Sequence, residues 1–244
     1  MNNQPDDPLH SKEGILLINK PAGKTSFHLV YRLRQLTGIK KIGHCGTLDP
    51  FATGVMVMLV GKTFTRCSNM LTADNKQYLA TLCLGKFSTT YDRDGAISPV
   101  SDRVPSLEEI ESVVASFQGE IMQTPPMFSA KKVSGKKLYE LARQGIEIAR
   151  EAQKVTLSIS IIEYSYPFLT LDVSCSKGTY IRSLAYDMGQ ALKTGAYLDK
   201  LVRLRSGSFY IEDCIDYSML TIPSFNYRHH LIKLDPENLS LVTS

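Results

Sequence analysis

The chain contains no tryptophan, and none of its five cysteines falls in a C-x-x-C pair. An odd number of scattered cysteines argues against a disulfide framework, and their spacing argues against a zinc site. No apolar run approaches the roughly 20 residues of a membrane span, the longest candidate covering only residues 55–60. The first twelve residues are polar and lack the apolar segment of a signal peptide. We therefore expect a cytoplasmic protein that has no metal site and no association with a membrane.

Acidic residues are absent from residues 14–48, although the whole chain carries a formal net charge of only +4. A second basic stretch, residues 124–154, has seven basic side chains against three acidic ones. Clustered positive charge of this kind can form a phosphate-binding face, and the alternative is an ordinary solvated lysine surface. The basic residues of the first stretch are Lys20, Lys24, Arg32, Arg34, Lys40 and Lys41.

The hydrophobic pattern mixes strands and helices. Alternating or continuous apolar residues predict strands near 14–19, 55–60, 78–84 and 206–211, and a hairpin formed by residues 155–161 and 169–175. Helical spacing predicts helices over 25–37, 106–117, 137–143 and 181–192, and Ser106 with Glu109 forms a capping box for the second of these. This order of elements predicts an α+β fold, with a mixed α/β sheet.

Asp49 is the first carboxylate after Glu13, and it lies in the motif Gly-His-Cys-Gly-Thr-Leu-Asp-Pro at residues 43–50. Basic surroundings favour the charged form of a carboxyl group, which suits a nucleophile or a base better than an acid. A simple surface turn is the alternative for a lone Leu-Asp-Pro sequence. Adjacent His44 and Cys45 also admit a cysteine nucleophile, but neighbouring side chains of an extended segment point to opposite faces.

This motif resembles the active-site motif of the bacterial TruB family of tRNA pseudouridine synthases, and the dyskerin-type synthases carry a similar one. Residues 14–26, Tyr78, residues 127–140 and residues 175–184 resemble further blocks of the TruB family. The resemblance implies a pseudouridine-synthase-type fold: a mixed, mostly antiparallel sheet flanked by helices. It implies a catalytic domain over 13–212 with a basic RNA-gripping insertion at 124–154. Residues 1–12 and 213–244 are then short tails, the second too short for a complete PUA domain.

The same resemblance implies an isomerase that converts uridine to pseudouridine in the T-loop of tRNA, at position 55 in tRNA numbering. The base would be flipped out, cleaved from its ribose, rotated and rejoined through C5, with no cofactor and no metal. The resemblance places Asp49, Tyr78 and Arg182 in catalysis and leaves open whether Asp49 acts as nucleophile or base. It also places His44, Tyr180, Leu201 and Lys20 at the substrate. The RNA-binding residues it implies are Lys131, Lys132, Lys136, Lys137 and Arg143.

One departure from the family pattern is Thr89, which stands where family members commonly have an aspartate. Three other functions stay open: an RNA-binding module that does not need its chemistry, a cysteine hydrolase that uses Cys45, and a guide-dependent synthase of the dyskerin type. The insertion at 124–154 favours the stand-alone bacterial enzyme. We expect a monomer whose partner is the T-arm of tRNA.

Overall fold

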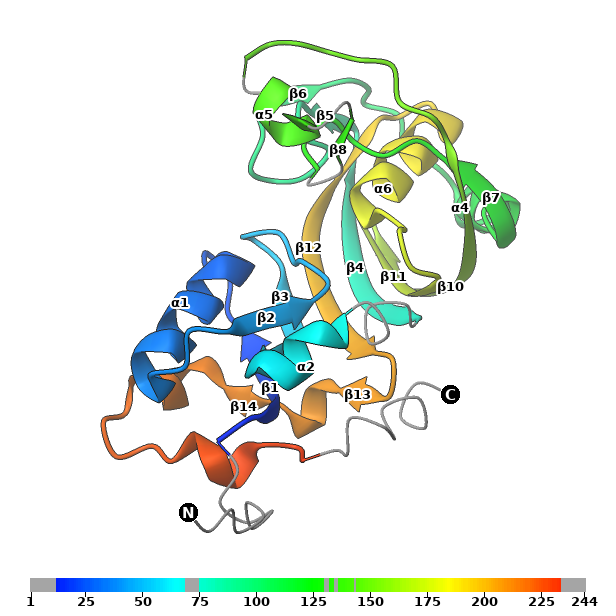
Figure 1. The fold of residues 1–244 in the computed structure, drawn as a ribbon. Helices are drawn as coiled ribbons and strands as arrows, with labels where there is room; N and C mark the ends of the chain where they lie inside the picture. The colour runs from blue at the N-terminus through cyan, green and yellow to red at the C-terminus, as the bar shows by residue number, and fades with distance from the viewer. Residues whose placement is uncertain (1–11, 69–74, 130–131, 134–135, 143, 234–244) are drawn as a thin grey trace, which may run out of the picture. The chain divides into compact units, whose positions relative to one another are not determined.

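The computed structural model describes residues 12–68, 75–129, 132–133, 136–142 and 144–233 (Figure 1). The chain divides into two compact units. Unit 1 comprises residues 1–77 and 202–244, and unit 2 comprises residues 78–201. Two strands, β4 (Lys76–Leu84) and β12 (Ala196–Ser206), have residues in both units.

Unit 1 is built on an antiparallel pair of strands, β1 (Gly14–Lys20) and β3 (Thr53–Val60), whose register runs from Gly14 opposite Val60 to Lys20 opposite Gly54. The antiparallel strand β2 (Ile42–Cys45) also pairs with β3. The end of β12 pairs with β3 in parallel, and β14 (Ile215–Asp216) pairs with β1 in parallel. The short strand β13 (Phe209–Tyr210) folds back on β12.

Alternate residues of β1 and β3 form the core of unit 1. Ile15 and Leu17 pack with Val55, Val57 and Leu59 in one apolar cluster. The intervening side chains are buried too, so β3 is covered on both faces, as its continuous apolar run predicts. Cys45, Phe64 and Phe209 complete the cluster.

Two helices belong to unit 1, α1 (Ser26–Thr37) and the short α2 (Lys62–Arg66). The Thr25 side chain caps α1 by accepting a hydrogen bond from the His28 amide, and Gly38 ends the helix with a φ of 71°. After β12, three 3₁₀ turns follow: η2 (Ile211–Asp213), η3 (Tyr217–Thr221) and η4 (Tyr227–His230). An antiparallel bridge between Ile15 and Ile232 joins this last segment to β1.

Unit 2 contains the strand order β12-β4-β11-β10-β7. The hairpin of β10 (Gln153–Ser165) and β11 (Phe168–Cys175) is antiparallel, and β7 (Gly119–Gln123) pairs antiparallel with β10. Helices α4 (Leu107–Ser116) and α6 (Ile181–Ala191) accompany this sheet (Figure 1). Two short ladders complete the unit, β5 (Lys86–Ser88) with β6 (Ile97–Pro99) and β8 (Lys132–Val133) with β9 (Lys136–Lys137), the latter followed by α5 (Leu138–Ala142).

The predicted α+β class and the mostly antiparallel mixed sheet are confirmed. The predicted last strand over 206–211 is correct only in part: β12 ends at Ser206, the two-residue strand β13 covers Phe209–Tyr210, and Ile211 begins a 3₁₀ turn. The first three residues of the motif at 43–50 belong to β2. Within the described residues no helix is both long and apolar enough to cross a membrane.

Candidate active site

In unit 1, the motif loop that carries Asp49 is fastened to the start of α1. The Ser26 hydroxyl, buried in the first turn of that helix, accepts from the Leu48 amide at 3.0 Å and donates to the Leu48 carbonyl at 3.1 Å. The Ala52 amide donates to the Asp49 carbonyl at 3.1 Å, and this bond closes the turn over Pro50. Asp49 itself is partly exposed.

Lys20 joins this loop to the turn that follows β1 through hydrogen bonds. Its Nζ donates to the carbonyls of Lys24 at 2.7 Å, Pro21 at 2.9 Å and Pro50 at 3.1 Å, and the residue is fully buried. Burial lowers the pKa of Lys20 to about 8, while the Asp49 carboxylate acts in the opposite direction. Because the three ammonium donors meet carbonyls, the contacts fit a bracing role better than a direct phosphate contact.

Arg203 is a second buried cation of unit 1. This residue is 1% exposed, its Nε donates to the Val55 carbonyl at 2.8 Å, and one Nη donates to the Gly46 carbonyl at 3.2 Å. Burial and the Arg203 charge both lower the pKa of His44, so the imidazole is neutral at physiological pH. Among the described residues, none hydrogen-bonds the buried Nδ1 of His44. A neutral imidazole can both donate and accept a hydrogen bond at a base edge.

In unit 2, Arg182 is almost completely buried at the start of α6 and forms an ion pair with Asp92, at 3.2 Å between Nη1 and Oδ2. The same Nη1 donates to the Thr90 carbonyl at 3.3 Å, and Nη2 donates to the Phe128 carbonyl at 2.7 Å. The other oxygen of Asp92 accepts from the Thr90 hydroxyl at 2.5 Å and from the Asp94 amide at 3.0 Å. The guanidinium is therefore fixed in place by partners from two separate loops.

The end of β7 holds the start of α6. The side-chain amide of Gln123 accepts from the Tyr180 amide at 2.8 Å and donates to the Tyr180 carbonyl at 3.1 Å. The Ser183 hydroxyl donates to the Thr124 carbonyl at 2.8 Å. Tyr180 caps the helix with an extended backbone and a partly exposed side chain, so its ring is available to a ligand.

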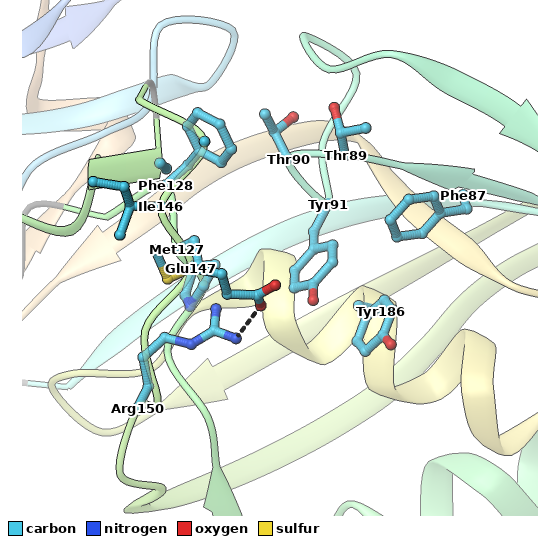
Figure 2. A pocket seen from close by; sticks show the side chains of 13 residues that line it. Phe87, Thr89, Thr90, Tyr91, Met127, Phe128, Ile146, Glu147, Arg150 and Tyr186 are labelled. Atoms are coloured by element: carbon cyan, nitrogen blue, oxygen red, sulfur yellow. Dashed lines mark hydrogen bonds and ion pairs between the residues drawn. The ribbon is translucent and has the colours of Figure 1, made fainter. Parts of the chain in front are cut away.

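A cavity of about 370 Å³ lies beside the Arg182 anchor, entirely within unit 2 (Figure 2). One wall is aromatic: the rings of Tyr91 and Tyr186 stack at 4.2 Å between centroids, and Phe87 meets both edge-on. The opposite wall includes Glu147 and Arg150, which pair at 3.1 Å. Thr90 and Phe128, whose carbonyls hold Arg182, also line this cavity.

A family model described as TruB family pseudouridylate synthase (N terminal domain) matches residues 34–181. The chain belongs to this family. The tRNA pseudouridine synthase B of Chlamydia trachomatis serovar L2 is 55% identical over 221 residues, which cover 91% of this chain and 92% of that protein. The tRNA pseudouridine synthase B of Protochlamydia amoebophila is 50% identical over 235 residues, covering 96% of this chain and 89% of its own length.

A solved structure of a Cbf5-Nop10-Gar1 complex contains a chain that superposes with a TM-score of 0.71 at 27% identity. The match covers 95% of this chain and 66% of that longer one. The fold of the TruB-family chain described here is therefore shared with a longer chain of that complex. The sheet and the flanking helices predicted from the motif resemblance agree with this match.

The two units each hold a part of the predicted site of this TruB-family chain. Lys20, His44 and Asp49 lie in unit 1, and Tyr78 (β4), Tyr180, Arg182 and Leu201 (β12) lie in unit 2. The resemblance also implies that Arg182 pairs with the Asp49 carboxylate; this pairing stays a prediction, as does each residue's role. Lys131 and Arg143 lie outside the described residues, and Lys132, Lys136 and Lys137 lie in the β8–β9 ladder.

Two charged residues of the site were missed by sequence reasoning. Asp92 lies in the block where Thr89 replaces an aspartate, but its carboxylate was given no role, and the structure shows that it pairs with Arg182. Arg203 was given no role, and no strand was predicted over residues 196–205, where β12 lies. The available signal was a charged residue flanked by Val202 and Leu204, in a run with the alternation of a buried strand.

Proposed function

We propose that this protein converts uridine to pseudouridine at position 55, in the T-loop of tRNA. Family membership and the printed names of the relatives support the reaction. The observation that carries the proposal is the motif loop, which presents a partly exposed Asp49 over the buried ammonium of Lys20. A carboxylate in such surroundings stays ionised and is able to attack or to abstract a proton without a metal.

The chemistry is an isomerisation in which atoms balance within one nucleotide. The bond between N1 of uracil and C1′ of ribose breaks, the base rotates, and a bond forms between C5 and C1′. The proton that leaves C5 is matched by the proton that N1 gains, so no cofactor is consumed. Asp49 acts on the ribose as nucleophile or as base, and the Tyr78 hydroxyl moves the C5 proton.

Arg182 aims the Asp49 carboxylate in this proposal. A guanidinium held rigidly by Asp92 and two carbonyls can donate to a further carboxylate without reorganising. Tyr180 and Leu201 would enclose the flipped uracil, and His44 would contact its edge. Lys131, Lys132, Lys136, Lys137 and Arg143 would bind phosphates of the T-arm, and the enzyme would act as a monomer in the cytoplasm.

The test uses an unmodified tRNA transcript and a matched transcript with cytidine at position 55. After incubation with the protein, pseudouridines are located along each transcript by chemical labelling and primer extension. The proposal predicts one new pseudouridine, at position 55 of the first transcript, and none in the second. Modification at another position would disprove the site. Tight binding of both transcripts without modification would instead indicate an RNA-binding module.

A further inference from the structure

The outward face of α1 carries two aromatic rings that the fold of unit 1 does not use. Phe27 is 63% exposed and Tyr31 is 53% exposed, and the two stand one helical turn apart. The opposite side of α1 supplies Leu29, Val30 and Leu33 to the core, so the helix is already anchored without these rings. Large aromatic side chains left in water at this spacing indicate a surface that binds something.

Cations flank the two rings. The Arg34 guanidinium lies 6.0 Å from the centroid of Phe27, and the exposed Lys24 precedes the helix. Arg32 donates to Gln35 at 3.1 Å, and Gln35 in turn donates to the Tyr31 hydroxyl at 2.9 Å, which fixes that ring. Since residues 14–48 contain no carboxylate, nothing on this segment offsets the positive charge. We call Lys24, Phe27, Tyr31 and Arg34 the α1 face.

The α1 face begins at the loop that carries Asp49. Ser26, the residue before Phe27, holds Leu48 through two hydrogen bonds. The Gly23 amide donates to the Pro50 carbonyl at 2.8 Å, and Lys20 joins the carbonyls of Lys24 and Pro50. Hence hydrogen bonds join the α1 face directly to the motif loop within unit 1.

We propose that the α1 face is a stacking surface for unpaired nucleotides of the RNA substrate, next to the uridine that reacts. Two neighbouring rings flanked by cations match a single strand, because bases stack on the rings while phosphates meet the lysine and arginine. A partner protein would favour a larger and less charged apolar patch than two rings flanked by cations. The inference rests on the proposed function, because it assumes that RNA reaches Asp49.

The absence of tryptophan from the chain makes the first test direct. A Tyr31→Trp variant has one tryptophan, and a Tyr210→Trp variant is the matched control. Tyr210 is also an exposed aromatic of unit 1, 47% exposed, with Arg205 at 6.0 Å from its ring. Stacking predicts that tRNA quenches the fluorescence of the Tyr31→Trp variant and leaves that of Tyr210→Trp unchanged. Equal quenching in both, or none in either, would overturn the proposal.

The second test measures affinity in an Asp49→Asn background, so that binding is read whether or not isomerisation occurs. The double substitution Phe27→Ala with Tyr31→Ala should weaken tRNA binding at least about fivefold, which is the lower limit of what one stacked base contributes. The double substitution Phe27→Tyr with Tyr31→Phe, which keeps both rings, should bind tRNA with the affinity of the Asp49→Asn parent. Tyr210→Ala should also leave that affinity unchanged.

Two results would contradict the proposal while leaving the proposed function intact. The first is unchanged affinity of the double alanine variant together with normal pseudouridine formation by the wild type. The second is a concentration-dependent dimer in sedimentation velocity that the double substitution abolishes, because the α1 face would then bind a second copy of the chain. A wild type that binds tRNA through this face but forms no pseudouridine would overturn only the proposed function.

Discussion

Arg182 is held by a carboxylate that occupies the same short block as the substituted Thr89. Asp92 is buried, forms an ion pair with the guanidinium and bridges β12 at Leu198. Thr89 uses its side chain differently, accepting from the Ala96 amide at 3.1 Å. The carboxylate that Arg182 needs is therefore present within the same block, so the Thr89 substitution does not leave the arginine without an acidic partner.

Asp92→Asn should destabilise the protein by about 3–5 kcal/mol, because it leaves the buried Arg182 charge without its anionic partner in unit 2. Urea denaturation measures the loss. Asp94→Asn is the matched control, since Asp94 is exposed and uses only its amide at this site, and it should change stability by less than about 0.5 kcal/mol. Equal stability of the two variants would contradict the assigned role of Asp92.

Activity should fall as pH rises through about 8, where Lys20 loses its proton. The neutral amine has only two N–H groups for the three carbonyls that accept from the ammonium, so one hydrogen bond is lost. The positive charge near Asp49 is lost as well. Single-turnover rates at saturating enzyme, measured from pH 6 to 10, would show this inflection. A Lys20→Met variant should be slower at all pH values and lack the inflection; the same inflection in Lys20→Met would assign it to another group.

Asp187→Asn should stabilise the protein by about 1 kcal/mol at pH 8, allowing for partial solvent screening. Burial raises the pKa of Asp187 to about 6, so the folded state binds a proton that the unfolded state, with a pKa of 3.8, has already released. The ionised Asp187 carboxylate therefore destabilises the folded state above pH 6, and this destabilisation disappears below pH 4. Thermal denaturation of both proteins at pH 8 and pH 4 should show the difference only at pH 8; a difference that persists at pH 4 would rule out this cause.

At the scale of elements, Gly54 allows β3 and β12 to approach each other. Its φ is 104°, and an added Cβ would lie 2.2 Å from the Arg203 carbonyl oxygen and 2.7 Å from the Arg203 nitrogen. Gly54→Ala would push the strands apart and displace the arginine that bonds to Gly46. The expected cost exceeds about 3 kcal/mol, combining overpacking with backbone strain.

Gly38→Ala is the matched control for this glycine. It has a φ of 71° and no atom within 4 Å of an added Cβ, so only the backbone strain of about 1–2 kcal/mol remains. Chemical denaturation of both variants separates the free-energy cost of overpacking from that of backbone strain. Similar losses in the two variants would contradict the close approach of the strands.

Elements with local signals could be predicted from the sequence. Ser106 and Glu109 form the expected capping box of α4, Thr25 and Gly38 bound α1, and β10 pairs with β11 across Tyr166-Pro167. β12 and β14 were missed because what fixes them is remote in sequence: β12 pairs with β3, and β14 pairs with β1. Such pairing partners cannot be identified from a local pattern.

At the scale of the whole molecule, the predicted site residues come from both ends and the middle of the chain. The motif pointed to Asp49, and the resemblance pointed to Tyr78, Tyr180 and Arg182. The partners Asp92 and Arg203 could not be found in this way, because their importance lies in contacts with Arg182 and Gly46 that only folding creates. Sequence thus pointed to candidate reactive groups, whose roles stay predictions, and did not point to the residues that form these contacts.

Binding of tRNA should weaken steeply with salt if the basic residues of the insertion meet phosphates. Substituting Lys132, Lys136 and Lys137 by glutamine should lower the slope of log affinity against log salt by up to about 3, since each phosphate contact contributes nearly one. Filter binding between 50 and 300 mM salt, on the order of cellular ionic strength, measures the slope. An unchanged slope would remove these lysines from the interface.

The central claim is that the protein isomerises a uridine by means of Asp49, and tritium release tests it most directly. An unmodified tRNA transcript carrying tritium at C5 of uridine is mixed with excess wild-type protein or with Asp49→Asn, and release into solvent is followed. The wild type should release one tritium per tRNA, while Asp49→Asn should bind the tRNA with similar affinity and release none. Release by Asp49→Asn at the wild-type rate would contradict the account.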